Sequence, residues 1–219
     1  IHAVAQNGTA WHGNASWAHN NSIFNARSFF QVGSVRPARQ NQYGTTFTSQ
    51  LWKGGFFTFS GSQDKNRGNV NGNVLIPLPG ERTPLTTDPA TRAIVLRLID
   101  AYPNVAPNRP DMAARALNTN SLQSIDTNTA TGQLNQKVGS KDMLLLRYAF
   151  TSQHVTAFQF VKGQNPDTDN KNHNARITWN RTLSPSTVID VSAGLDRTGS
   201  LLLPTADAVG PVYLNGLQI

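Results

Sequence analysis

The segment VIDVSAGLD at residues 188–196 alternates apolar and polar side chains from Ile189 onward. In an extended strand Ile189, Val191, Ala193 and Leu195 share one face, and Asp190 lies on the other. About ten residues is the length that crosses a bilayer as a tilted strand. A half-buried strand of a soluble sandwich shows the same alternation, so the connections between strands must separate the two interpretations.

The same pattern recurs along the chain and predicts seven strands. They lie near residues 9–19, 42–51, 56–63, 124–137, 143–154, 170–183 and 187–198. The connections are alternately short and long, and the longest is a predicted loop over residues 64–121. Short turns at one end and long loops at the other are typical of a barrel exported across one membrane. A connection of this length is improbable inside a compact soluble sheet. We therefore predict an all-β fold, an antiparallel transmembrane β-barrel segment of about seven meandering strands.

The long loop contains one helix signal. Thr87 or Asp88 can cap the helix, Pro89 suits its first position, and Pro103 ends it. Apolar residues recur between them at helical spacing. We expect a short helix within a long extracellular loop.

The composition narrows the class of protein. Hydrophobic residues make up 38% and charged residues 14% of the chain, and no run of 18 apolar residues exists that would predict a transmembrane helix. The chain has no cysteine and a formal charge of +7. The cations are spread singly, without a nucleic-acid-binding motif, so we expect no nucleic acid partner. A cationic surface indicates either solvated loops or contact with acidic lipopolysaccharide.

Strand alternation assigns candidate residues to two faces. The membrane-facing aromatic candidates are Trp11, Trp17, Tyr43 and Phe47, since aromatic rings settle at the water interfaces of a bilayer. The lumen-facing candidates are His12, Asn14, Gln42, Gln50 and Asp190. The alternative for Trp11 and Trp17 is the core of a soluble sandwich.

Residues for catalysis or metal binding are scarce. Glu81 is the one glutamate, and no nucleophile elbow, phosphate loop or dinucleotide fingerprint is present. His2, His12 and His19 do not form a convincing metal site, because positions 12 and 19 fall on opposite faces of a strand. We expect no enzyme activity, no catalytic residue, no cofactor and no metal.

A series of short motifs resembles the TonB-dependent outer-membrane transporters, specifically the Oar-like group, which carries a carboxypeptidase-regulatory-like domain ahead of its plug. The motifs are Trp11-His12-Gly13, Asn25-Ala26-Arg27-Ser28-Phe29-Phe30, Arg39-Gln40-Asn41-Gln42-Tyr43-Gly44, Phe56-Phe57-Thr58-Phe59, Leu98-Ile99-Asp100-Ala101-Tyr102-Pro103-Asn104, Ser140-Lys141-Asp142-Met143-Leu144 with Arg147-Tyr148, and Leu183-Ser184-Pro185-Ser186-Thr187-Val188. Their order and spacing over nearly the whole chain carry the resemblance.

The chain departs from that family at two places. The family's Gly-Gly-Pro reads Ser49-Gln50-Leu51 here, and its Arg-x-Asp before a periplasmic turn reads Gln133-Leu134-Asn135. The second change removes an opposite-charge pair from the expected lumen face. The fold implied by the resemblance is unaffected.

The resemblance implies a plugged barrel of about 22 strands, to which this chain contributes about seven. It also implies import of a nutrient such as a glycan, peptide or metal chelate, driven by the TonB complex acting on a plug region that we expect outside this chain. The expected partners are outer-membrane lipid, lipopolysaccharide, the TonB complex and an unidentified transported ligand, and the expected location is the bacterial outer membrane. A barrel acting in secretion or adhesion, and a soluble secreted β-sheet protein that binds carbohydrate through Trp11, Trp17 or Trp52, remain alternatives.

Overall fold

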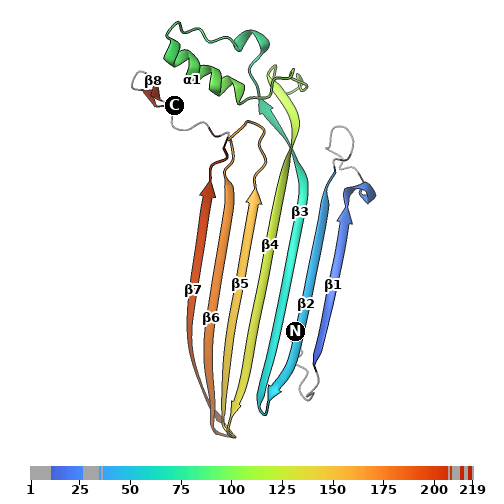
Figure 1. Cartoon of the computed structure of the whole chain (residues 1–219), viewed down its shortest axis with the longest axis vertical. Coiled ribbons are helices and arrows are strands. Elements are labelled where there is room, and N and C mark those ends of the chain that lie inside the picture. The colour runs from blue at the N-terminus through green and yellow to red at the C-terminus, as the bar shows by residue number, and fades with distance from the viewer. Residues whose placement is uncertain are drawn as a thin grey trace.

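Seven strands form one antiparallel sheet in the order in which they occur along the chain (Figure 1). The computed structural model describes residues 11–26, 35, 37–206 and 208, with the backbone of residues 213–214 and 217–218. The strands are β1 (His12–Asn21), β2 (Arg39–Trp52), β3 (Gly55–Leu75), β4 (Ala116–Val138), β5 (Asp142–Thr156), β6 (Asp167–Ser184) and β7 (Thr187–Leu203). The predicted all-β antiparallel meander is confirmed.

The remaining elements are short. They are η1 (Ser22–Phe24), η2 (Pro79–Glu81), α1 (Pro89–Asp100), and the paired two-residue strands β8 (Tyr213–Leu214) and β9 (Leu217–Gln218). The helix begins where the sequence predicts, because the backbone N–H of Thr91 donates to Oδ2 of Asp88 at 2.8 Å and Pro89 occupies the first turn. Among the described residues, no helix combines the length and apolarity needed to cross a bilayer.

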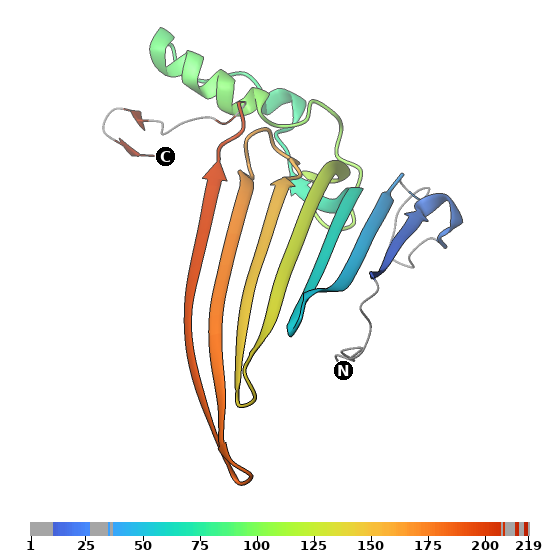
Figure 2. The same cartoon turned by 60° about the horizontal axis from the view of Figure 1, so that its bottom comes forward.

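Short and long connections lie at opposite ends of the sheet (Figures 1 and 2). Residues 53–54, 139–141 and 185–186 make the short turns, whereas residues 22–38, 76–115 and 157–166 make the longer connections. Gly54 and Gly139 adopt positive φ angles of 78° and 68°, which a residue with a Cβ rarely adopts. We infer that the end with the long connections faces the outside of the cell.

The long loop is shorter than the sequence predicts. Residues 64–75 and 116–121 are strand, because β3 and β4 pair without interruption from Gly55 opposite Gln136 to Leu75 opposite Ala116. The loop is therefore residues 76–115. Backbone pairing and amide side chains hold this extension, and neither of its faces has the apolar alternation from which strands were predicted. Residues 9 and 10 of the first predicted strand, and also His2 and Arg27, lie outside the described residues.

The strand register divides the side chains of the sheet into two faces, since directly paired residues project to the same side. The apolar face carries Trp17, Tyr43, Phe47, Phe57, Phe59, Leu134, Leu144, Leu146, Tyr148, Phe150, Ile177, Trp179, Ile189, Val191, Ala193 and Leu195. The polar face carries His12, Asn14, Gln42, Thr46, Thr58, Asp64, Thr127, Thr129, Gln133, Arg147, Asn174, Arg176, Asn180, Asp190 and Ser192.

No second layer covers the apolar face in the described part of the chain. Many of its large side chains are exposed, with Trp17 at 66% and Leu195 at 70%, and the others are only partly buried by their neighbours on the same face. The buried hydrophobic residues are Ile76, Ala116 and Leu117, which lie where the long loop leaves the sheet. A soluble sandwich would bury the alternating apolar side chains against a second sheet. The apolar face is instead available to lipid.

Candidate functional site

The four aromatic candidates lie together on the apolar face at the β1–β2 edge. Trp17 pairs directly with Tyr43 across the two strands. The rings of Trp11 and Phe47 have their centroids 4.5 Å apart, nearer the end with the short turns. Trp11 and Trp17 are six residues apart, so their rings lie at two heights on the apolar face.

Sequence reasoning missed aromatic residues at the opposite edge of the same face. At the short-turn end, the indole N–H of Trp179 donates to Oδ1 of Asp142 at 2.9 Å, and the Arg181 guanidinium carbon lies 6.0 Å from the Trp179 ring centroid. Higher up, Tyr148 and His173 are joined by a 2.8 Å hydrogen bond. The apolar face therefore carries aromatic rings near both edges of the sheet, and aromatic residues at the water interfaces are typical of membrane barrels. Their alignment depends on register, which sequence patterning alone did not supply.

The apolar face is also hollowed at its centre, where a depression has a volume of about 710 Å³. Small residues at Gly132, Ala175 and Ala193 create it between larger neighbours such as Leu146 and Tyr148. Its walls are almost wholly apolar. Because it opens on the lipid-facing side, it is a place for acyl chains rather than for a polar ligand.

The lumen candidates lie on the polar face but are not brought together. His12 and Asn14 pair with Thr48 and Thr46 of β2, whereas Asp190 lies at the far edge on β7. Nε2 of Gln50 donates to the backbone oxygen of Trp52 at 3.1 Å. These residues form part of a broad polar wall, not a compact site.

Gln42 belongs to a small cluster on this wall. Nε2 of Gln40 and Nε2 of Gln42 both donate to Oδ2 of Asp64, at 2.9 and 3.1 Å. The other oxygen of Asp64 is buried and has no hydrogen-bond partner in the described part of the chain. A hollow of about 360 Å³ opens beside it, lined in part by Ser16, Gln42 and Thr127.

Strands β6 and β7 carry a ladder of paired polar side chains on the same face. Cross-strand hydrogen bonds join Asn170 with Ser200 at 2.6 Å, Asn172 with Thr198 at 3.3 Å and Thr178 with Ser192 at 2.9 Å, and also join Asn174 with Asp196 and Asn180 with Asp190. Each partner is directly opposite in the register. The ladder interrupts at the pair Arg176 and Gly194. These cross-strand hydrogen bonds satisfy amide and hydroxyl side chains within the wall and leave its surface hydrophilic.

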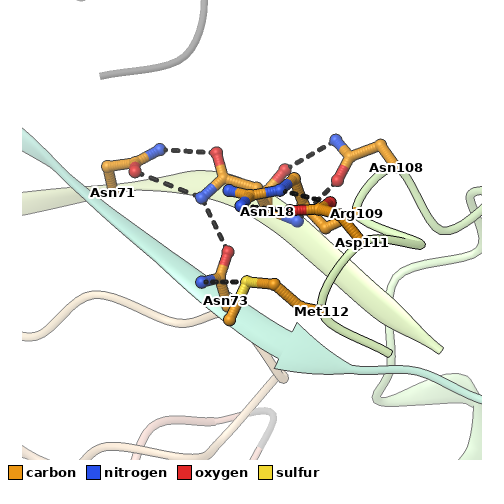
Figure 3. A network of polar contacts seen from close by, with 7 residues as sticks. All are labelled: Asn71, Asn73, Asn108, Arg109, Asp111, Met112 and Asn118. Carbon is orange, nitrogen blue, oxygen red and sulfur yellow. Dashed lines mark hydrogen bonds and ion pairs between the residues drawn. The ribbon is translucent and has the colours of Figure 1, made fainter. Parts of the chain in front are cut away.

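The long loop is tied to the sheet by a network of asparagine side chains (Figure 3). Asn118 and Asn71 exchange hydrogen bonds at 3.0 and 3.2 Å, and Asn118 also donates to Oδ1 of Asn73 at 2.8 Å. From the loop, Asn108 accepts from the Asn118 backbone N–H at 2.7 Å and donates to the Asn118 carbonyl at 3.0 Å. The network fixes residues 108–113 against the outer ends of β3 and β4.

Two ion pairs stabilise the loop internally. The Arg109 guanidinium forms a bidentate pair with Asp111, with contacts of 2.9 and 2.7 Å, and hydrogen bonding from Arg109 lowers the pKa of Asp111. At the base of the loop, Arg115 pairs with Glu81. The loop is therefore an ordered structure over the outer end of the sheet.

The metal-ligating side chains of the described residues are dispersed. Within the described residues no group of three or more His, Cys, Asp or Glu side chains converges on one point. His12 and His19 project to opposite faces, and Nδ1 of His19 lies 2.8 Å from Oδ1 of Asn41. The described strands present two surfaces, one apolar and one polar.

The family comparison agrees with this two-faced sheet. A family model described as "Outer membrane beta barrel domain" matches residues 5–218. No curated protein and no solved structure matches the chain. The match spans almost all of the sequence, and it explains both the apolar face and the segregation of short turns from long loops. The chain therefore belongs to the outer membrane β-barrel domain family and resides in the outer membrane.

Proposed function

We propose that the chain forms part of the barrel wall of a TonB-dependent transporter, which imports a nutrient such as a glycan, peptide or metal chelate. The observation that carries the proposal is the broad polar wall that runs across seven strands behind the apolar face. Small barrels fill their interior with side chains, whereas wide barrels enclose water and a plug. A wall of amides and hydroxyls suits a wide, hydrated interior.

The edges of the sheet support a larger barrel. Within the described residues β1 pairs only with β2, and β7 only with β6, so these seven strands leave two open edges. Every residue of β7 is exposed. Further strands must pair with both edges to close a barrel, because an unpaired edge in a bilayer leaves backbone N–H and C=O groups without partners.

The ordered loop supports capture of a ligand from outside the cell. Residues 76–115, with α1, extend over the outer end of the sheet (Figure 2). Loops at the outer mouth of a barrel are the first protein surface that an external ligand meets. In this proposal the apolar face contacts lipid and lipopolysaccharide, the TonB complex acts on a plug region beyond this chain, and no catalytic step is involved.

Energy dependence tests the proposal. Cells that make the full-length protein are compared with a strain lacking its gene, a strain lacking TonB and a strain lacking both, on a panel of single glycans, peptides and iron chelates. We expect the strain lacking the gene and the strain lacking TonB to lose growth on the same nutrient. The strain lacking both should grow no worse than either. The proposal of TonB-driven import is contradicted if the strain lacking only the gene fails to grow on a nutrient that the TonB-deficient strain uses normally.

Other barrel functions predict different results. A secretion barrel predicts loss of an exported protein from the culture medium in the strain without the gene, whether or not TonB is present. An adhesion barrel predicts loss of surface attachment under the same conditions. Either result replaces the transport proposal and leaves the barrel fold intact.

A further inference from the structure

Two arginines face each other on the polar face in the middle of the sheet. Arg147 of β5 and Arg176 of β6 are direct partners in the strand register, and both side chains are exposed. Like charges placed directly opposite on neighbouring strands destabilise the pairing. A pair of guanidinium groups in this position therefore requires an explanation beyond the stability of the wall.

Neither arginine has an anionic partner among the described residues. No carboxylate lies within 4.0 Å of either guanidinium group, and neither group donates a hydrogen bond to another described side chain or carbonyl. In contrast, the structure provides carboxylate partners for four other arginines, at positions 67, 109, 115 and 181. The nearest carboxylates on β7, Asp190 and Asp196, accept hydrogen bonds from asparagines of β6.

The neighbours in the same row are neutral. Gln133 is opposite Arg147 on β4, and Gly194 is opposite Arg176 on β7. A Cβ placed on Gly194 would lie 3.8 Å from Nε of Arg176, which is an ordinary contact, so Gly194 is close to this guanidinium without crowding it. Neither direct neighbour of the arginine pair carries a charge.

Arg147 and Arg176 lie at the level of the sheet that faces lipid on its other side. The residues next to each arginine in sequence, Leu146, Tyr148, Ala175 and Ile177, belong to the apolar face. The two charges therefore lie behind the lipid-facing part of the barrel. Ionisable side chains at membrane depth face the protein interior, where they mark pathways or partner sites.

We propose that Arg147 and Arg176 together bind a carboxylate or phosphate group inside the barrel. Guanidinium groups present fixed forks of N–H donors, which match the oxygen atoms of these anions, and two forks neutralise the charge that one anion carries. The anion is either dissolved in the interior or belongs to a polypeptide segment that occupies it. The inference rests on the polar face lining the barrel interior and not on energised import.

The first experiment uses the full-length protein in detergent, with inorganic phosphate as the probe. Binding is measured by calorimetry for the wild type and for R147Q, R176Q and R181Q. Arg181 is the matched control, since it lies on the apolar face beside Asp142. For a dissolved anion we expect wild-type binding that weakens with added salt, falls at least about tenfold in R147Q and R176Q, and is unchanged in R181Q.

The second experiment detects an anion supplied by the protein itself. If the wild type does not bind phosphate, the site is occupied by a carboxylate of a polypeptide segment inside the barrel. Loss of both arginines should then release that segment, so a protease should cleave it faster in the R147Q/R176Q double variant than in R181Q. Heat-dependent migration on a gel shows whether each barrel is folded. If the double variant does not fold, R147K and R176K retain the charge but lose the fork, and each should show a partial effect. A folded variant that matches the wild type in both phosphate binding and cleavage overturns the proposal.

Discussion

Ala193 and Ser192 are adjacent in β7, yet their side chains lie on opposite faces of the sheet. Ala193 pairs with Ile177 on the apolar face, and Ser192 pairs with Thr178 on the polar face. We predict that Ala193→Arg lowers the free energy of unfolding of the full-length barrel in lipid vesicles by about 2–4 kcal/mol, because it places a charge in the hydrocarbon. Urea titration followed by tryptophan fluorescence measures the change.

Ser192→Arg is the matched control for that substitution. It loses the 2.9 Å hydrogen bond with Thr178, which costs about 1 kcal/mol, but its charge stays in water. The assignment of the two faces is wrong if the arginine at position 192 is the more damaging of the two.

Single-residue alternation predicted the side of the sheet on which a residue lies, but not which residues meet. Trp17 and Tyr43 could be assigned to one face because each alternates with polar neighbours. That Arg147 lies opposite Arg176 depends on the register of β5 with β6. This register comes from the many pairings made at once along both strands, and the ten-residue connection 157–166 between them does not fix it by itself. The asparagine contacts depend on register in the same way.

At the scale of elements, Asn108 anchors the long loop to β4. Its side chain accepts from the N–H and donates to the C=O of Asn118, as a neighbouring strand would. We predict that Asn108→Ala speeds amide hydrogen exchange in residues 108–113 by roughly tenfold or more, since each hydrogen bond contributes about 1 kcal/mol. Asn108→Asp keeps the acceptor and should have a smaller effect. Equal exchange in both variants and the wild type would show that the loop is held elsewhere.

Acid pH should loosen the same segment. Because Arg109 lowers the pKa of Asp111, this contact is fully formed above the unfolded-state pKa of about 3.9 and is lost as the pH falls through the lower folded-state value. Protection factors of residues 108–113, corrected for intrinsic exchange, should therefore differ between wild type and Asp111→Asn at pH 6. The difference should narrow as the pH falls below the unfolded-state value, because protonation removes the charge of Asp111. A difference that does not change with pH cannot come from the carboxylate.

The turn between β4 and β5 depends on a backbone conformation that glycine supplies. Gly139 has φ of 68°, and no heavy atom lies within 4 Å of the position that a Cβ would take there, so a side chain meets conformational strain and no clash. We predict that Gly139→Ala lowers the free energy of unfolding by about 1 kcal/mol. Gly80, which has equal space but no positive φ, is the control, and Gly80→Ala should not destabilise the protein by a comparable amount. Equal losses in both variants would contradict this explanation.

Strands could be predicted from the sequence where one face meets lipid and the side chains alternate. The prediction was wrong where the strands extend beyond that region. Near the end with the short turns, apolar and polar side chains alternate along all seven strands, because one face meets lipid and the other meets water. Residues 64–75 and 116–121 have no such asymmetry: polar side chains predominate on both faces, and the pairing comes from backbone hydrogen bonds with asparagine contacts. A sequence rich in asparagine and glycine predicts a loop, since these residues favour turns. The tertiary pairing of the two segments overrides that local preference.

At the scale of the whole molecule, the sheet combines an exposed apolar face with two unpaired edges in its described part. Both features promote association in water, the edges by templating further strands and the face by hydrophobic contact. We predict that residues 1–219, produced alone and transferred from urea into detergent-free buffer, sediment as aggregates in the analytical ultracentrifuge. Detergent micelles should cover the apolar face and reduce the association but not abolish it, since the edges remain free. A monodisperse monomer in plain buffer would mean that the indole, phenyl and aliphatic groups of the apolar face are covered by protein, which contradicts a lipid-facing wall.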